Sequence, residues 1–252
     1  MADLELFQFA RSHYNEKARW ALDFKALPHV RHSLIPGPHM FTAKWLSGQQ
    51  QVPVLRRGKE VVAGSAQIIA RLEELQPEPN LYPKDPGERE GALAIQSRFD
   101  EEVGPAVRLA MFAELQADPS YFASLFTDDR SLPVRVAYRC ALPVLQMIMN
   151  RDLGITPDAV EPALAVTREA LDFVAESSVR SGHLVGDRFS VADLTAASLL
   201  MPAILPEGGI RYPEPLPAVV DSWVARFSEH PGAAWVREIY ARYRGSSAAI
   251  SG

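Results

Sequence analysis

Two hydroxyl side chains stand where a strand pattern gives way to a helical one. Ser12 and Tyr14 follow the short, aromatic-rich strand pattern 4–9 and lie close to a helical pattern that begins near Glu16. The first turn of a helix leaves backbone N–H groups unpaired and carries about half a positive charge. A hydroxyl there can donate to a thiolate, and lowering a thiol pKa of about 8.5 by two units takes roughly 2.7 kcal/mol. Alternatively, Ser12 only caps the helix, a role worth about 1 kcal/mol.

Two later segments could bind a ligand backbone and an anion. Pro53 cannot donate to a sheet, so within the strand pattern 52–56 it indicates a strand start, an edge or a special turn. A cis Val52–Pro53 bond would turn the N–H and carbonyl of Val52 outward, toward an extended ligand, although only about 5% of such bonds are cis. Ser65 begins the next helical pattern, where its hydroxyl and the adjacent N–H groups suit a carboxylate. A plain helix cap is again the alternative.

Short strands and helices alternate in the part of the chain that carries these residues. A β-α-β order, closed by parallel pairing, is followed by a β-β-α order. The expected strands are 4–9, 29–35, 52–56 and 60–63, and the expected helices are 16–27 and 65–75.

The rest of the chain has a helical pattern throughout. Four prolines within residues 76–87 predict a linker. Beyond it, helices are expected at 88–116 with a break near Gly104–Pro105, and at 133–151, 158–179, 191–201, 216–229 and 232–243. Residues 245–252 are expected to fray. The predicted fold class is therefore α/β plus all-α, with one domain over 1–80 and an all-helical domain over 88–252.

Composition excludes several classes of function. With 26 Lys and Arg against 31 Asp and Glu, the net charge of −5 argues against nucleic-acid binding. The single cysteine, Cys140, allows neither an internal disulfide nor a zinc site with several thiolates. No apolar run approaches the 20 or so residues of a membrane span, and no secretory signal opens the chain. His29 and His32 face opposite sides of a strand, so no metal site is expected. We expect a cytoplasmic protein with no membrane contact.

Taken in order, these segments resemble those of the cytosolic glutathione transferases. The matching patterns are S-x-Y-x-E-K-x-R from Ser12, Q-V-P-V-L from Gln51 and G-S-x-x-I from Gly64, followed by a proline-rich linker and an all-helical domain. Residues 186–194 (GDRFSVADL) match the family pattern at the start of the core C-terminal helix, where Ser190 and Asp193 form a capping box. The resemblance implies a thioredoxin-like domain that holds glutathione and a helical domain that holds a second substrate.

The resemblance also implies roles for individual residues. Ser12 would donate to the thiolate, and Tyr14 would line the thiol pocket or serve as the alternative donor. Val52 and Pro53 would pair with the cysteinyl backbone of glutathione. Ser65 would bind its γ-glutamyl carboxylate.

Two departures from the family pattern concern the same site. Gly64 stands where Glu or Asp is common, so one partner of the γ-glutamyl amino group is missing. The residues before Val52 read S-G-Q-Q-Q rather than the common N-P-x-G-K, although Gln51 could bond the glycyl end. His39, in the loop 36–40, could also reach the glutathione site.

The long helical pattern 88–116 carries mixed charge and apolar residues. The charged side chains are expected to pair at i,i+4 spacing on a solvated or dimer-facing surface, and they are Arg98, Asp100, Glu101, Glu102 and Arg108. Phe99, Met111 and Phe112 are candidates for an electrophile pocket, with at least two of them expected in the core.

The leading hypothesis is a glutathione transferase that adds the thiolate to an electrophilic small molecule, as in detoxification. Glutathione would be the cosubstrate, no prosthetic group is implied, and the family resemblance suggests a homodimer. One alternative is a non-catalytic binding or assembly protein with the same fold. Another is a different glutathione reaction, such as isomerisation, dehalogenation or peroxide reduction.

Overall fold

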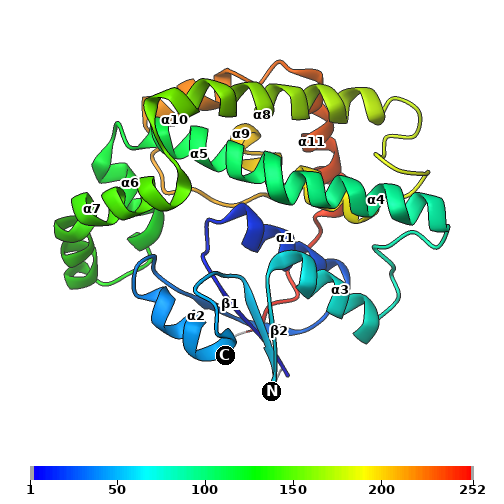
Figure 1. The fold of residues 1–252 in the computed structure, drawn as a ribbon, viewed down its shortest axis with the longest axis horizontal. Coiled ribbons are helices and arrows are strands. Elements are labelled where there is room, and N and C mark those ends of the chain that lie inside the picture. The colour runs from blue at the N-terminus through cyan, green and yellow to red at the C-terminus, as the bar shows by residue number, and fades with distance from the viewer. Residues whose placement is uncertain (1–2, 251–252) are drawn as a thin grey trace.

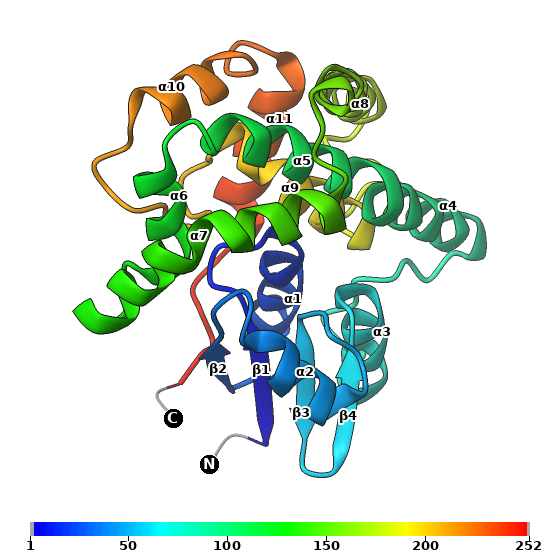
Figure 2. The same ribbon diagram turned by 60° about the vertical axis from the view of Figure 1, so that its left-hand side comes forward.

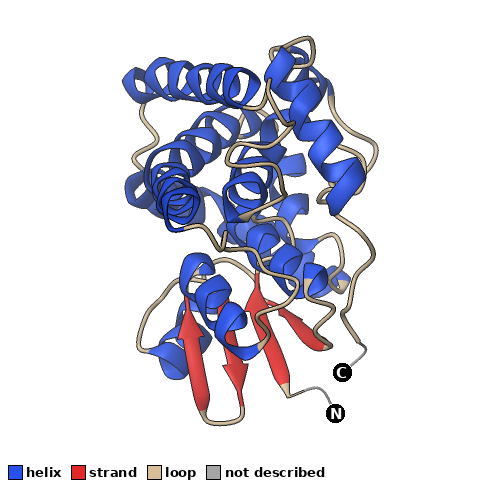
Figure 3. Ribbon diagram, turned by 90° about the vertical axis from the view of Figure 1, so that its right-hand side faces the viewer, coloured by secondary structure: helices blue, strands red, loops and turns tan. Residues whose placement is uncertain are grey.

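A computed structural model describes residues 3–250 as a four-stranded sheet with helices stacked above it (Figure 1). Figure 3 shows the strands gathered in the lower part of the molecule and helices filling the upper part. The lower part contains β1 (Leu4–Gln8), α1 (His13–Phe24), β2 (His29–Ser33), α2 (His39–Ser47), β3 (Val54–Arg57), β4 (Glu60–Ala63) and α3 (Ser65–Leu75).

The sheet has the strand order β2-β1-β3-β4. β1 runs parallel to β2 and antiparallel to β3, and β3 forms an antiparallel hairpin with β4. The β-α-β and β-β-α orders predicted from the sequence are both present. The sequence did not predict α2, because this helix has no apolar face turned to the core. Its Phe41 and Trp45 are 80% and 79% exposed, and only Ala43 is buried.

The upper part is helical, as predicted. It contains α4 (Pro86–Arg98), a π-helical turn η1 (Phe99–Val103), α5 (Gly104–Leu115), α6 (Pro119–Thr127), α7 (Leu132–Leu153), α8 (Pro157–Ser177), α9 (Val191–Ile204), α10 (Ala218–Ala225) and α11 (Pro231–Tyr243). The predicted capping box of α9 is present, with the Ser190 N–H donating to Asp193 at 2.9 Å. The sequence did not predict α6, which Asp118 caps by accepting from the Tyr121 N–H.

The break predicted at Gly104–Pro105 is instead a wide turn within a continuous helix. The Gly104 N–H donates to the Phe99 carbonyl, five residues back. Pro105 has no N–H, so the Asp100 carbonyl is left without a helical donor. The prediction was right about the place of the irregularity and wrong about its form.

The two layers meet along α1, which packs against α9. Trp20 of α1 is fully buried, lies against Phe189 and Tyr240, and donates its indole N–H to the Tyr243 carbonyl at 3.0 Å. The buried ammonium of Lys17 is 2.6 Å from a carboxylate oxygen of Asp100 in η1. Apolar packing and an ion pair therefore both join α1 to the helical layer.

The prediction that the C-terminal segment frays is wrong for residues 245–250. This segment runs down beside β2, as Figure 2 shows. The Ala248 N–H donates to Asp23 at 2.8 Å, and the Ile250 N–H donates to the His29 carbonyl at 3.0 Å. Residues 251–252 lie outside the described part of the chain. Across residues 3–250, none of the helices combines the length and the apolar character needed to cross a membrane.

Candidate functional site

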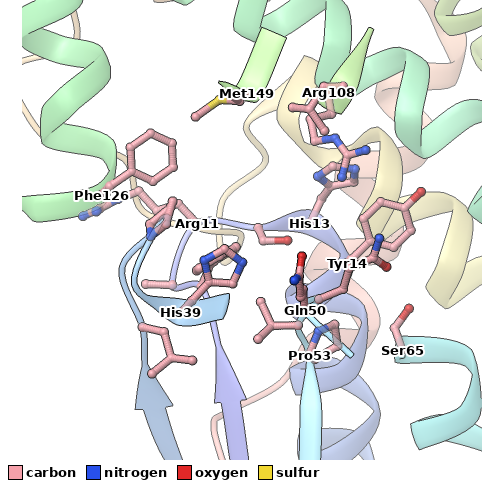
Figure 4. A pocket seen from close by; sticks show the side chains of 18 of the residues that line it. Arg11, His13, Tyr14, His39, Gln50, Pro53, Ser65, Arg108, Phe126 and Met149 are labelled. Carbon is pink, nitrogen blue, oxygen red and sulfur yellow. The ribbon is translucent and has the colours of Figure 1, made fainter. Parts of the chain in front are cut away.

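A cleft of about 1090 Å³ lies between the sheet layer and the helical layer, beside the contact that α1 makes. Its lower wall comes from the turn between β1 and α1, the segment before β3 and the start of α3. Its upper wall comes from α5, α6 and α7. Figure 4 shows Gln50, Pro53 and Ser65 on the lower side and Arg108, Phe126 and Met149 on the upper side. All eight residues predicted to form the site line this cleft.

Ser12 is the N-cap of α1. Its hydroxyl oxygen accepts from the Asn15 N–H at 3.4 Å, which is a long hydrogen bond. A hydroxyl has one proton and two lone pairs, so accepting from the helix leaves the proton free for another acceptor. The capping role and the thiolate-donor role that the sequence left as alternatives are compatible at this residue.

Tyr14 lines the cleft with its ring, but its hydroxyl is directed toward η1. The hydroxyl donates to the Asp100 carbonyl at 2.5 Å, the carbonyl that the wide turn leaves without a helical donor. A Cβ at Gly104 would lie 2.5 Å from this hydroxyl, so glycine makes the approach possible. Burial raises the pKa of Tyr14 above its usual range. In Figure 4 the hydroxyl points away from Gln50 and Pro53.

The Val52–Pro53 peptide bond is cis, as the resemblance implies. Neither the N–H nor the carbonyl of Val52 makes a hydrogen bond to any residue within 3–250, whereas the Pro53 carbonyl accepts from the Gly64 N–H at 2.9 Å. Gln51 beside them is exposed to solvent. Backbone groups for an extended ligand are thus open at the end of β3.

Ser65 opens α3 and is only 6% exposed, with its side chain at the cleft. Gly64 before it has φ +96°, a conformation that side chains other than that of glycine rarely adopt. The space for a Cβ at this position is taken by the side chain of Gln67. An acidic side chain at position 64 would therefore be strained in this backbone and would displace the Gln67 side chain.

His39 begins α2 and lies at the edge of the same cleft. Its Nδ1 accepts from the Gly37 N–H at 3.1 Å, and its ring meets the ring of Phe9 edge-on at 4.7 Å. Burial lowers the pKa of His39 below its usual value. The ring is therefore held in place at the edge of the cleft.

His13 is a functional candidate that the sequence patterns did not indicate. It is buried, and its Nε2 donates to the Gly104 carbonyl at 3.1 Å. Burial, followed by the positive charge of Arg108, lowers the pKa of His13 to about 3. The sequence signal that could have found it is its place directly between Ser12 and Tyr14.

Arg108 differs most from its predicted role. Arg98 and Glu102 do form an i,i+4 pair, at 3.6 Å, but Arg108 lies in the cleft. Its guanidinium is 5.7 Å from the centre of the Tyr14 ring, and its buried Nε has no hydrogen-bond partner within residues 3–250. Removal from water lowers its pKa. The sequence carries one signal for this: no acidic residue stands three or four positions from Arg108.

The upper wall of the cleft is largely apolar. Met111 and Phe112 from α5 line it, together with Phe126 and Met149 from α6 and α7. Phe99 is fully buried and contributes only to the core. Phe126 was missed because α6 was not predicted. In the described residues, no three His, Cys, Asp or Glu side chains lie together as a metal site would require.

Comparison with known proteins identifies the family. Residues 6–80 match the family model for the glutathione S-transferase N-terminal domain, and residues 139–231 match the model for the C-terminal domain. A glutathione S-transferase from Rhodospirillum rubrum has a similar structure, with a TM-score of 0.63 and 19% identity over 96% of this chain and 89% of that one. The chain belongs to the glutathione S-transferase family.

Two further proteins are similar to this chain. A theta class glutathione S-transferase from Xanthomonas axonopodis, solved with glutathione bound, has a TM-score of 0.56 and 16% identity over 98% of this chain and 100% of that one. A maleylpyruvate isomerase from Ralstonia is 33% identical over 105 residues, 40% of this chain. The match spans half of that isomerase's length. The family match supports a glutathione-dependent function.

Proposed function

We propose that this protein is a glutathione transferase in which the Ser12 hydroxyl stabilises the glutathione thiolate. The observation that carries the proposal is the contrast between the two hydroxyls beside the cleft. The Tyr14 hydroxyl donates to the Asp100 carbonyl, whereas Ser12 only accepts, from the Asn15 N–H. Ser12 therefore has a proton to donate, at the positive end of α1.

The remaining residues predicted for the site would hold glutathione in an extended form. The open N–H and carbonyl of Val52, next to Pro53, would pair with the cysteinyl backbone. The Ser65 hydroxyl and the N–H groups at the start of α3 would bind the γ-glutamyl carboxylate. Gln51 and His39 would lie near the glycyl end, and the absence of a side chain at Gly64 would leave the γ-glutamyl end open.

The reaction would be a nucleophilic addition or substitution by sulfur. The thiol proton leaves to solvent, and the Ser12 O–H together with the field of α1 stabilises the resulting thiolate. The thiolate forms a C–S bond to the electrophilic carbon. In a substitution, the bond to the leaving group breaks and its electron pair departs with that group. In an addition, the π electron pair of the attacked bond moves to the neighbouring atom, which takes a proton from solvent. Neutral His13 adds no charge next to the sulfur.

Calorimetric titration with reduced glutathione tests the proposal. Native protein should bind glutathione, Ser65→Ala should bind it about tenfold more weakly, and the exposed Ser222→Ala should bind as the native protein does. In the bound state, ultraviolet absorbance should show the thiol pKa rising by about one to two units in Ser12→Ala, which corresponds to roughly 1.4–2.7 kcal/mol. Loss of binding only in Tyr14→Phe, or no binding at millimolar glutathione, would overturn the proposal.

A second reaction at the same site is glutathione-dependent isomerisation. The observation in its favour is the match to a protein named maleylpyruvate isomerase. In such a reaction the thiolate adds to a carbon–carbon double bond, the new single bond rotates, and elimination returns glutathione unchanged. The ratio of glutathione consumed to product formed separates the two reactions, since it is one for conjugation and zero for isomerisation.

The homodimer implied by the resemblance is also proposed here. Light scattering on the purified protein measures the mass directly, against 27.8 kDa for one chain.

A further inference from the structure

Arg108 is a positive charge that the fold holds in the cleft without a negative partner. Two other arginines at the cleft are neutralised: Arg11 lies 2.6 Å from Asp128, and Arg130 lies 3.3 Å from Asp129. No carboxylate within residues 3–250 forms an ion pair with Arg108. Burying a charge without a partner is unfavourable. A fold that retains such a charge beside a cleft has the character of a binding site for an anion.

The nearby acidic groups are engaged elsewhere. Both carboxylate oxygens of Asp100 accept from the Lys17 ammonium, at 2.8 and 2.6 Å. Glu101 accepts from the Ser97 hydroxyl at 2.6 Å. His13, whose pKa the charge of Arg108 helps to lower, is neutral and donates to a backbone carbonyl. No side chain next to Arg108 therefore competes for the guanidinium.

We propose that Arg108 binds a carboxylate group of the second substrate, so that the protein selects electrophiles that carry a carboxylate. This inference rests on the proposed function and names the substrate class of its second pocket. The guanidinium offers a planar fork of N–H donors that fits a carboxylate with two parallel hydrogen bonds. The apolar wall formed by Phe112, Phe126 and Met149 would contact the rest of the molecule.

The position of Arg108 suits this role. It stands one helical turn after Gly104, whose carbonyl accepts from His13 and whose missing side chain gives room to the Tyr14 hydroxyl. His13 and Tyr14 directly follow Ser12 in the chain. Figure 4 shows the guanidinium beside the His13 ring, across the cleft from Gln50 and Pro53. A carboxylate bound at Arg108 would leave the other end of a small substrate facing the proposed thiolate.

A matched pair of electrophiles tests the inference. The acid is 4-chloro-3-nitrobenzoate and the neutral partner is its methyl ester. With both, the glutathione sulfur forms a bond to the ring carbon that carries chlorine, chloride leaves with the electron pair, and the thiol proton passes to solvent. Each kcat/KM is divided by the uncatalysed rate constant with glutathione, which removes the intrinsic difference in reactivity.

Native protein should prefer the acid, and Arg108→Gln should lose about 10- to 100-fold in kcat/KM for the acid with little change for the ester. Arg108→Lys should recover part of the preference. Arg98→Gln, which removes an arginine of the same helical segment from outside the cleft, should behave as the native protein. Equal normalised kcat/KM for acid and ester in the native protein would overturn the inference while leaving the transferase function intact. Arg108→Gln lowering the affinity for glutathione itself would also overturn it, because the guanidinium would then serve glutathione.

Calorimetry with the acid alone, without glutathione, separates the two proposals. Binding of 4-chloro-3-nitrobenzoate that disappears in Arg108→Gln supports the carboxylate site even if glutathione fails to bind and the transferase proposal falls. Equal binding to the native protein and to Arg108→Gln overturns the carboxylate site whatever the activity.

Discussion

Single side chains at the cleft show how burial decides protonation and hydrogen bonding. The Tyr14 hydroxyl is used by a backbone carbonyl, so its ring shapes the cleft while its proton is engaged. Ser12 accepts from the helix and keeps its proton. The imidazole of His13 is held neutral by burial and by Arg108. The three adjacent residues differ because His13 and Tyr14 donate to backbone carbonyls of the helical layer, whereas the Ser12 hydroxyl bonds within α1.

His13 makes stability depend on pH. Its folded-state pKa of about 3 lies below the ordinary 6.5, so the unfolded chain takes up a proton that the folded protein does not. The contribution of neutral His13 to the free energy of unfolding is complete above pH 6.5. It is lost as the pH falls toward 3, at about 1.4 kcal/mol per pH unit. Between pH 7.5 and 5.0, urea unfolding should show native protein losing about 2 kcal/mol more than His13→Gln loses. Equal losses would show that His13 is not responsible.

The wide turn η1 is the element that joins the site to the helical layer. Pro105 removes a backbone donor, the turn leaves the Asp100 carbonyl free, and Tyr14 donates to it. The same turn supports the Asp100 side chain that neutralises Lys17. Pro105 thus leaves the Asp100 carbonyl as an acceptor for Tyr14, and Gly104 leaves space for the hydroxyl end of the Tyr14 ring.

Glycine at position 104 should be required for the hydrogen bond from Tyr14 to the Asp100 carbonyl. A Cβ there would meet the Tyr14 Oη at 2.5 Å and Cζ at 2.9 Å, so Gly104→Ala should destabilise the protein by about 1–3 kcal/mol. Combining it with Tyr14→Phe should cost less than the sum of the two single changes, because the closest clash is removed.

Gly91 in α4 is the matched control, since its Cβ would lie at an ordinary 3.9 Å from Val185. Gly91→Ala should stabilise the helix by up to about 1 kcal/mol. Denaturant unfolding of the four variants measures all of these effects, and a stabilising Gly104→Ala would contradict the close approach of Tyr14.

Across the molecule as a whole, a buried ionic network connects the two ends of the chain. Arg244, after α11, lies 2.6 Å from Glu16 and 2.9 Å from Asp23, both in α1. Arg19 and Arg31 pair with the same two carboxylates, at 2.8 Å each. The C-terminal segment beyond Arg244 then follows β2. The helical layer is therefore held to the sheet layer by charge as well as by the packing around Trp20.

Arg244→Gln should lower the free energy of unfolding by about 3 kcal/mol, because two buried carboxylates each lose a charged partner. The control is Arg242→Gln, which removes an exposed pair with Glu238 and should change stability by less than about 1 kcal/mol. Urea unfolding followed by circular dichroism measures both. Similar effects of the two changes would mean that the network does not join the layers.

Much of the fold was predictable because its signals are local. The strand and helix patterns of the first 80 residues, the proline-rich connection and the capping box of α9 each depend on residues within a few positions of one another. The exceptions were α2 and α6. The apolar residues of α2 face outward, so no buried stripe marked the helix.

Residue order alone places the groups that stand at the ends of elements: Ser12 before α1, Pro53 before β3 and Ser65 at the start of α3. Spacing along the chain is enough for this, because each group acts on the backbone beside it. Which charges are paired depends instead on the folded arrangement. Asp100 pairs with Lys17, 83 positions away, whereas Arg108 lines the cleft with no ion-pair partner among residues 3–250. The spacing around Arg108 shows only that no acidic residue of its own helix can pair with it. Whether a distant carboxylate meets a buried charge is set by which segments the core brings together.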